Sequence, residues 1–316
     1  MRLYTLVLSI LLFSCKDALD TVTSDPYTEI QKVLSINPSA LENYAAQGKP
    51  AYVNKDNTGP NAITDKAATL GRVLFYDKNL STNNTIACAS CHKQEFAFGD
   101  TAVSSLGVEN GRTERHSMRL INTRYANEAK FFWNERAASL EAQTTMPIVD
   151  HLEMGFSGQT GRGNITSLLT KLNGIGYYKE LFTLAYGDAT ITEARMQTAL
   201  AQFIRSIQSF DSKYDIGRAQ VGNDGAPFPN FNAQENAGKN LFLAPPIFNA
   251  ASERIGGGFG CQGCHQAPEF DIDPNSRNNG FIGVIGSAQN DLNNTRSPSL
   301  RDILNAAGVA NTPFMH

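Results

Sequence analysis

The stretch Cys88-Ala89-Ser90-Cys91-His92 decides the fold, and Cys261-Gln262-Gly263-Cys264-His265 repeats its pattern further along the chain. Two cysteines three positions apart at the start of a helical turn lie on one face. Both thiols can therefore form thioether bonds to the two vinyl groups of one haem. The histidine that follows places its imidazole under the porphyrin as the proximal iron ligand. We therefore predict that each motif attaches one haem c covalently, the first through Cys88, Cys91 and His92 and the second through Cys261, Cys264 and His265.

Other chemistry of a Cys-x-x-Cys pair explains less. One pair could be half of a zinc site, a redox-active dithiol or a disulfide, and two pairs would supply the four thiolates of a zinc site. The pairs begin at positions 88 and 261, which are 173 residues apart. Structural zinc pairs usually lie closer, and zinc gives no reason for a histidine directly after each pair. Haem attachment accounts for both features.

The sequence around the two motifs also repeats. Leu-Gly-Arg-Val-Leu-Phe at 70–75 precedes the first motif, and Ala-Gly-Lys-Asn-Leu-Phe at 237–242 precedes the second. After the motifs, residues 115–120 loosely echo residues 296–300. Each unit is thus predicted to contain a helix, a haem-binding turn, a loop and another helix.

The apolar pattern predicts a mainly α chain with little β structure. Few stretches alternate with the period of a strand, whereas residues 192–210 carry apolar side chains at helical spacing. We expect two cytochrome c-like domains, each with one covalently attached haem c. The N-terminal domain would span 61–216 and the C-terminal domain 217–316, with a Gly/Pro/Asn-rich break at 217–232.

Composition excludes several classes of protein. The chain has 316 residues, of which 41% are hydrophobic and 18% charged, so disorder, a coiled coil, collagen and a multi-span membrane protein are all disfavoured. A net charge of −3 argues against a nucleic-acid partner. The five cysteines resolve into the two pairs and Cys15. That is too few for a disulfide-stapled secreted scaffold.

The first residues are typical of an export signal. Arg2 is followed by an almost wholly apolar run over 3–13. About 20 apolar residues are needed to cross a bilayer, so this run is too short to span one and matches a secretory signal instead. The protein is therefore expected outside the cytoplasm, in the periplasm or cell envelope.

The residues at the end of this run predict lipidation. Leu-Phe-Ser-Cys at 12–15 resembles a bacterial lipoprotein cleavage site, so residues 1–14 would be removed and Cys15 would carry the lipid. A plain secretory signal or a short anchor with an incidental cysteine is the alternative. Residues 15–60 would form a tether with one helix near 27–36. Membrane contact is expected through the lipid only.

Two haems fit either an electron carrier or an enzyme. A carrier blocks both axial positions of each iron, whereas an enzyme leaves one position open with acid–base groups above it. Beyond the two proximal histidines the chain has only His116, His151 and His316. We expect His151 to be structural.

Several further segments resemble the bacterial di-haem cytochrome c peroxidases, including their MauG-like branch. The resemblance extends from about Leu70 to His316. Besides both haem motifs and residues 70–75, the following segments carry it: Phe-Ala-Phe-Gly-Asp at 96–100, Trp-x-x-Arg-Ala-x-x-Leu-Glu-x-Gln at 133–143, Glu-Met-Gly at 153–155 and Pro-Ser-Leu-Arg at 298–301.

The resemblance implies a peroxidase that reduces hydrogen peroxide to water. In that family the N-terminal haem is the peroxide site, Glu153 is its distal carboxylate and Gln143 lines the same pocket. Trp133 would lie between the haems and relay electrons from the C-terminal haem, which a small cytochrome c or cupredoxin reduces. A carboxylate in a partly dry pocket has a raised pKa and can both take and deliver a proton. A MauG-like oxidase acting on a protein substrate and a non-catalytic di-haem carrier are the alternatives.

Other properties are expected from the resemblance alone. A calcium ion would lie between the domains, and whether the relatives' homodimer forms is left open. His116 could be a reversible ligand of the first haem, a replacement in the calcium region or a satisfied interior histidine. Residues 312–316 match the start of a stretch that continues in relatives. We therefore expect a fragment that lacks the second haem's distal ligand, for which Met315 and His316 are poor substitutes.

Overall fold

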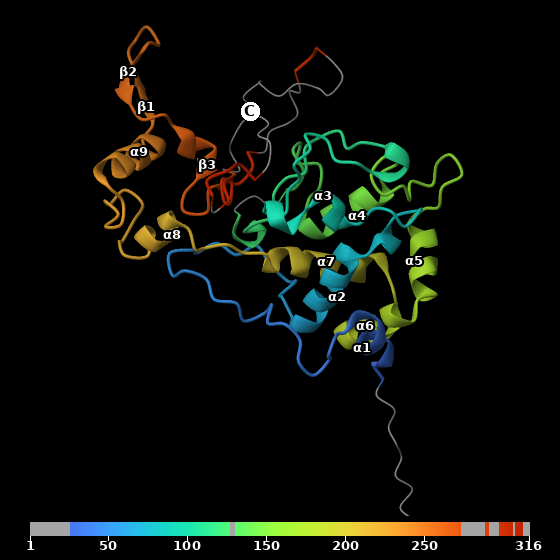
Figure 1. The fold of residues 1–316 in the computed structure, drawn as a ribbon. Helices are drawn as coiled ribbons and strands as arrows, with labels where there is room; N and C mark the ends of the chain where they lie inside the picture. Colours follow the sequence, from blue (N-terminus) through green and yellow to red (C-terminus); the bar gives the residue numbers. More distant parts are fainter. Residues whose placement is uncertain (1–25, 127–129, 273–287, 291–296, 306, 312–316) are drawn as a thin grey trace, which may run out of the picture.

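Helices dominate the computed structural model (Figure 1), which describes residues 26–126, 130–272, 288–290, 297–305 and 307–311. The α-helices are α1 (Thr28–Leu34), α2 (Asp65–Tyr76), α3 (Cys88–Cys91), α4 (Leu140–Val149), α5 (Ile165–Asn173), α6 (Gly176–Tyr186), α7 (Glu193–Ser206), α8 (Lys213–Arg218) and α9 (Ala233–Leu243). Short 3-10 turns are η1 (Lys78–Leu80), η2 (Gln94–Phe96), η3 (Val108–Asn110), η4 (Thr123–Tyr125) and η5 (Cys261–Gly263). The prediction of a mainly α chain is confirmed.

The little β structure lies near the second haem motif. β1 (Pro246–Phe248) and β2 (Arg254–Gly257) form an antiparallel hairpin in which Ile247 pairs with Gly256. β3 (His265–Gln266) and β4 (Asp271–Ile272) form a second antiparallel pair. In Figure 1 the first hairpin lies beside α9, away from the bundle of α2, α4 and α7.

Packing of α2 against α7 forms the centre of the larger helical part. The residue at the crossing is Gly71, where an added Cβ would lie 2.0 Å from the carbonyl oxygen of Ala199. Only glycine lets the two backbones approach this closely, so the Leu-Gly-Arg segment sets the distance between these helices. The side-chain hydroxyls of Thr64 and Thr192 cap the two helices at their N-termini.

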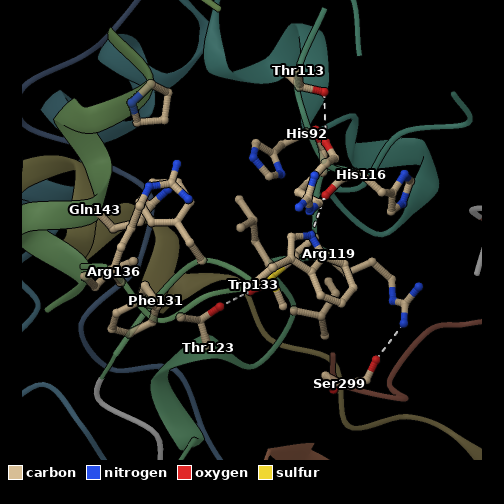
Figure 2. Close-up of a pocket in the computed structure, with 18 of the residues that line it drawn as sticks. His92, Thr113, His116, Arg119, Thr123, Phe131, Trp133, Arg136, Gln143 and Ser299 are labelled. Carbon is tan, nitrogen blue, oxygen red and sulfur yellow. Dashed lines mark hydrogen bonds between the residues drawn. The ribbon is translucent and has the colours of Figure 1, made fainter. Parts of the chain in front are cut away.

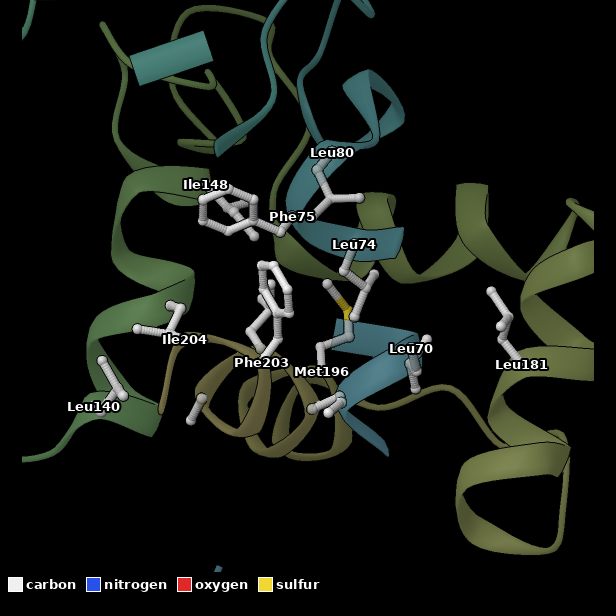
Figure 3. Close-up of a cluster of buried hydrophobic side chains, with 14 of the residues drawn as sticks. Leu70, Leu74, Phe75, Leu80, Leu140, Ile148, Leu181, Met196, Phe203 and Ile204 are labelled. Carbon is white, nitrogen blue, oxygen red and sulfur yellow. The ribbon is translucent and has the colours of Figure 1, made fainter. Parts of the chain in front are cut away.

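The hydrophobic core fills the space between α2, α4, α6 and α7 (Figure 3). Leu70 and Leu74 lie one turn apart on α2, with Phe75 next to Leu74; all three are at most 1% exposed and meet Met196 and Phe203 of α7. Burying each such side chain contributes about 1.5–3 kcal/mol. The apolar stripe over 192–210 is therefore core, as predicted, although the helix ends at Ser206.

The predicted order of elements is present in the first unit. A helix precedes each motif, because residues 70–75 belong to α2 and residues 237–242 to α9. In the first unit the haem-binding turn α3 and a loop are followed by η4 and the helix α4. The segments that echo each other, 115–120 and 297–300, are not themselves helical. Residues after the second motif are described only in part, so the order in the second unit stays a prediction.

Residues 26–60 are packed, so describing them as a tether was wrong for this part of the segment. The predicted helix near 27–36 is present as α1, and Ile30 and Val53 are fully buried. Lys55 lies 3.1 Å from carboxylate oxygens of both Glu269 and Asp271. The segment thus runs along α2 and α7 and reaches the residues that follow the second motif.

A buried ion pair joins three distant parts of the chain. Arg301 donates to both carboxylate oxygens of Asp215 on α8, at 2.7 and 2.6 Å. The Tyr52 hydroxyl donates to the same carboxylate at 2.6 Å. Arg301 and Asp215 are 5% and 4% exposed.

No helix among the described residues is long and apolar enough to span a bilayer. Residues 1–14 and Cys15 lie outside the described residues, as do Met315 and His316. The predicted export signal, lipidation site and chain-end ligands therefore stay predictions. The domain boundary at 217–232 also stays a prediction.

Candidate active site

The first Cys-x-x-Cys-His motif forms the short helix α3, as its spacing predicts. The amide of His92 donates to the carbonyl of Cys88 at 2.9 Å, which closes one helical turn. Cys88 and Cys91 are half-buried free thiols. Burial raises the pKa of Cys88 to about 12 and that of Cys91 to about 11. A raised thiol pKa disfavours a reactive dithiol, which needs a low pKa.

The ring of His92 is oriented for metal binding. Its Nδ1 lies 2.9 Å from the carbonyl oxygen of Phe98, to which it donates. Burial, the largest effect, lowers the pKa of His92, so the imidazole is neutral. The bond to Phe98 orients the ring, and the Met118 backbone also interacts with it. Nε2 is the nitrogen that could bind iron.

Two adjoining cavities meet at His92. The larger has a volume of about 190 Å³ and opens to solvent, and the smaller has a volume of about 60 Å³ beside Cys88 and Cys91. Both are lined by His92, Gln143 and Glu153. A group attached at α3 would therefore lie against Gln143 and Glu153.

Glu153 shares these cavities with the motif, and its environment makes it a candidate acid–base group. Burial, followed by the charge of Asp150, raises its pKa to about 7, although the Arg136 guanidinium opposes this. A carboxyl group with a pKa near neutrality can take up and release a proton at working pH.

A loop clamps the backbone that carries Glu153. The amide of Val108 donates to the Glu153 carbonyl at 2.9 Å. Gly107 passes so close that an added Cβ would lie 1.9 Å from the carbonyl oxygen of Leu152. On the other side, the Asp150 carboxylate accepts from the amides of Leu152 and Glu153 at 2.8 and 3.0 Å. Glu153 is therefore held from both sides.

Replacing Gly107 with alanine should displace the turn that bears Glu153. Because the added methyl would meet backbone, the turn has to move, and we expect a loss of stability of about 1–3 kcal/mol. Urea unfolding would measure it. Gly222→Ala, at a site with nothing within 4 Å of the added Cβ, is the control. Equal stability of both variants would contradict the clamp.

Gln143 projects into the site from α4. Leu140, Gln143 and Pro147 are spaced along one face of this helix, and all three line the larger cavity. Figure 2 shows Gln143 pointing toward the space beside His92. The structure thus brings Gln143 and Glu153 to one pocket, as the resemblance implies.

Trp133 is buried in the wall of the larger cavity. It is 5% exposed, and its indole Nε1 donates to the carbonyl oxygen of His116 at 2.8 Å (Figure 2). The same cavity is lined by Glu269 and Asp271, which follow the second motif. Trp133 therefore lies on a wall shared by parts of the chain that carry different motifs.

His116 is not an interior histidine whose two ring nitrogens are both hydrogen-bonded. It is 5% exposed, and its Nδ1 lies 3.0 Å from the Ala102 carbonyl oxygen, but its buried Nε2 has no hydrogen-bond partner. In Figure 2, His116 and Gln143 lie on opposite sides of His92. A role as a haem ligand or in the calcium region stays a prediction. His151 bonds to Ser157 at 2.9 Å, as a structural histidine would.

Asp150 and Gly107 were not predicted as site residues. Asp150 lies in the segment just before Glu153, but a capping carboxylate gives no distinctive sequence signal there. Gly107 acts only through its lack of a side chain, and its partner is 45 positions away in sequence. Arg136 was visible in the Trp-x-x-Arg segment, although no role was assigned to it.

The second motif forms a 3-10 turn where the first forms an α-helical turn, and His265 begins β3. Cys261, Cys264 and His265 are half-buried, and Cys261 begins η5. The amide of Phe259 donates to the Leu241 carbonyl of α9 at 2.7 Å. Residues 273–287 and 291–296 lie outside the described residues, so the space facing His265 is not defined.

A mainly helical chain in which a Cys-x-x-Cys-His motif shares a cavity with a carboxyl group whose pKa is near neutrality has the site of a haem-dependent oxidoreductase. Comparison with known proteins agrees. Residues 65–221 match the family model described as di-haem cytochrome c peroxidase.

Curated relatives include both branches of this family. The chain is 29% identical over 263 residues to the methylamine utilization protein MauG of Methylophilus methylotrophus, covering 81% of this chain and 69% of the relative. It is 29% identical over 223 residues to the cytochrome c551 peroxidase of Nitrosomonas europaea, covering 71% and 57%.

Solved structures share the fold. A MauG-like protein associated with microbial copper homeostasis aligns with a TM-score of 0.62 at 24% identity, over 85% of this chain and 77% of that one. A variant of a diheme peroxidase from Burkholderia thailandensis aligns with a TM-score of 0.51 at 21% identity, over 72% and 56%.

Residues 65–221, which carry the first haem motif, belong to the di-haem cytochrome c peroxidase family, whose cofactor is haem c. The family is one of peroxidases and related oxidoreductases. The aligned region spans between about half and about two thirds of the length of most of the curated relatives.

Proposed function

We propose that this protein is a di-haem cytochrome c peroxidase, which reduces hydrogen peroxide to water with electrons from a small donor such as cytochrome c or a cupredoxin. The observation that supports this most is the placement of Glu153, with a pKa raised to about 7, in the cavity that also contains Cys88, Cys91 and His92. A carrier that only transfers electrons has no use for such a group.

The residues present fit the haem that the family implies. Cys88 and Cys91 would hold it covalently, and Nε2 of His92 would bind its iron. Bound there, the haem would supply the redox chemistry that splits the O–O bond. A second haem c would be held by Cys261, Cys264 and His265, in a second cytochrome c-like domain.

Glu153 would move the proton that this reaction requires. Its carboxylate takes the proton from hydrogen peroxide and delivers it to the departing oxygen, which leaves as water. Burial makes the carboxylate basic enough to accept the proton and acidic enough to return it. The Gln143 amide, with both a donor and an acceptor, orients the peroxide oxygens in the same pocket.

Trp133 would carry electrons into this pocket. Its burial in the wall shared with residues 269–271 supports a position on the route from the second haem site. Its indole N–H bond to the His116 carbonyl fixes the ring in one orientation. Electrons from the donor would enter at the second motif.

The pH dependence should report Glu153. Because the carboxylate must be ionised to accept a proton, the rate of peroxide reduction should fall as pH decreases through about 7, the pKa of Glu153. Steady-state oxidation of reduced cytochrome c between pH 5 and about 9 would measure this decrease in rate. A flat profile through neutrality would contradict the assignment of Glu153 as the base.

Optical spectra of the full-length protein test the proposed function directly. Spectra of the resting and half-reduced forms report the spin state and open coordination positions at each iron, and peroxide is added afterwards. A peroxidase should have one site open to peroxide and oxidise reduced cytochrome c. Six-coordinate low-spin iron at both sites and no donor oxidation would show a non-catalytic electron carrier.

A MauG-like oxidase is the second candidate, and the 81% coverage of this chain by a MauG protein favours it. Such an enzyme would act on a protein substrate. When peroxide is added without an electron donor, the oxidised state of such an enzyme should persist. The oxidised state of a peroxidase that depends on cytochrome c should decay instead.

Other properties are proposals of the same kind. Export to the periplasm or cell envelope, with lipid on Cys15 as the only membrane contact, rests on residues 1–15. One calcium ion and a homodimer rest on the family alone. His116 is proposed as a reversible ligand of the first haem, because its buried Nε2 lacks a partner in this conformation.

A further inference from the structure

Two adjacent tyrosines share one carboxylate near the first haem motif. The hydroxyls of Tyr177 and Tyr178, at the start of α6, both donate to Oδ2 of Asp77 at 2.7 Å. Their ring centroids lie 4.8 Å apart. Tyr178 is fully buried, whereas Tyr177 is half-buried. The pair therefore extends from the core toward the surface around a single proton acceptor.

The inner end of this pair lies near the first motif. Tyr178 packs in the core cluster against which Cys88 also packs, and a charge on Cys88 would act on the Tyr178 phenol. A second line of rings starts from the same place. The centroid of Phe75 lies 6.4 Å from that of His92 and 5.2 Å from that of Tyr76. Aromatic side chains thus connect the proposed haem ligands to the surface.

Both lines end at one groove. Tyr76, Asp77 and Tyr177 line an open groove of about 720 Å³. Its remaining walls combine apolar side chains, among them Val33, Leu34, Leu41 and Val73, with polar ones, namely Ser35, Asn37, Glu42, Thr69, Arg72 and Gln94. A small planar molecule with an apolar ring and a hydroxyl, such as a phenol, matches walls of both kinds.

The Tyr177–Asp77 contact suits one-electron chemistry. A phenol gives up an electron far more readily when its proton leaves at the same time, and a carboxylate at 2.7 Å can receive that proton. The arrangement at Trp133 differs, because its N–H donates to a backbone carbonyl, which is not a base. The proposed reduction of peroxide by a protein donor uses neither tyrosine.

We propose that Tyr178 and Tyr177 form a second electron route to the first haem site, through which small phenols bound in the groove are oxidised by one electron each. This inference rests on the proposed peroxidase function, because hydrogen peroxide is the oxidant. Tyr177 gives an electron inward through Tyr178 and its proton to Asp77. A phenol in the groove then transfers one electron and one proton, so its O–H bond breaks and that of Tyr177 forms again.

The overall reaction balances over two such events. Two phenols become two phenoxyl radicals, and one hydrogen peroxide becomes two waters. Asp77 releases one proton to solvent after each event, and the peroxide site takes up the two protons that water formation requires. Electrons from the second haem are not needed on this route.

Radical trapping tests the route without relying on turnover. Hydrogen peroxide is added to the full-length holoprotein without a donor and with a nitroso spin trap, and the labelled residue is identified by mass spectrometry. We expect the label on Tyr177, and a tyrosyl signal by electron paramagnetic resonance. Tyr177→Phe should lose this label, and Tyr178→Phe and Asp77→Asn should lower its yield.

Tyr186→Phe is the matched control. Tyr186 is a half-buried tyrosine on the same helix, and its hydroxyl donates to the Arg195 carbonyl at 2.7 Å, but it does not line the groove. The control variant should keep both the label on Tyr177 and the oxidation of guaiacol, the phenol used as probe. Tyr177→Phe should lose most guaiacol oxidation and keep oxidation of reduced cytochrome c.

Two results would overturn the inference. One is the absence of label from Tyr177 in the unmodified protein, and the other is unchanged guaiacol oxidation in Tyr177→Phe. If reduced cytochrome c is still oxidised in either case, only the second route fails. If peroxide causes oxidation of neither guaiacol nor reduced cytochrome c, the proposed peroxidase function fails as well.

Discussion

Replacing Glu153 with glutamine should lower peroxide turnover about 10²- to 10⁴-fold, the usual contribution of a positioned acid–base group. Glutamine keeps the size and polarity of the side chain but cannot take the peroxide proton. The remaining rate should no longer fall as pH decreases through about 7, because the group with that pKa has been removed. Stopped-flow oxidation of reduced cytochrome c across this pH range measures both effects.

Measuring the stability of Glu153→Gln distinguishes a loss of catalysis from a loss of folding. Burial raises the pKa of Glu153 in the folded protein, so the stability linked to this group is present at low pH and is lost as pH rises through about 7. Glutamine cannot ionise, so Glu153→Gln should be at least as stable as the unmodified protein above that pH. Loss of activity would then not be due to unfolding.

Glu114→Gln provides the matched control. Glu114 lies on the wall of the same cavity but is exposed. Its replacement should change turnover by no more than about twofold, as expected for a surface substitution. Equal losses in both variants would indicate that the overall charge of the cavity matters rather than a proton transfer by Glu153.

The haem motifs could be predicted from the sequence because their chemistry depends on local spacing. Cys88, Cys91 and His92 are fixed by one helical turn. Gln143 and Glu153 have no such spacing of their own, and they were assigned through the resemblance of the segments around them to the di-haem peroxidases.

The close contacts around this pocket could not be predicted, because they join positions that are far apart in sequence. Gly107 meets the Leu152 carbonyl through the absence of a side chain, which no periodicity reveals. The same holds for Lys55, which lies in a polar, aperiodic stretch yet makes a buried contact to Glu269 and Asp271. A few side-chain contacts hold such a stretch against the rest of the protein, although the stretch forms no helix or strand.

Asp215 shows how much depends on one of these distant contacts, and its replacement should be the most destabilising of the changes considered. Asp215→Ala would leave the Arg301 guanidinium buried without its carboxylate partner, since the two are 4% and 5% exposed. Removing one partner of a buried ion pair costs about 3–5 kcal/mol. The Tyr52 hydroxyl would lose its acceptor in the same variant. Urea unfolding at neutral pH would measure the change.

Two further variants serve as controls for Asp215→Ala: one breaks an exposed ion pair, and the other replaces both residues of the buried pair. Asp188→Ala breaks the solvent-exposed pair with Arg195 and should leave the unfolding midpoint nearly unchanged. Asp215→Leu combined with Arg301→Met removes both buried charges and should recover part of the stability that Asp215→Ala loses, because no unpaired charge remains. A double variant less stable than Asp215→Ala would show that the pair is net stabilising.

The pH dependence of the unmodified protein provides an independent check on the same contact. Burial alone would raise the pKa of Asp215, but its bonds to Arg301 outweigh this and lower it below the usual value. The stability that the pair contributes is therefore present above the ordinary aspartate pKa and is lost as pH falls through the lowered folded value. Asp215→Ala should lack this acid-dependent loss. Because Arg301 lies 86 positions from Asp215 and Tyr52 lies 163 positions from it, a smaller acid-dependent loss in the variant would show that this one carboxylate holds three parts of the chain together.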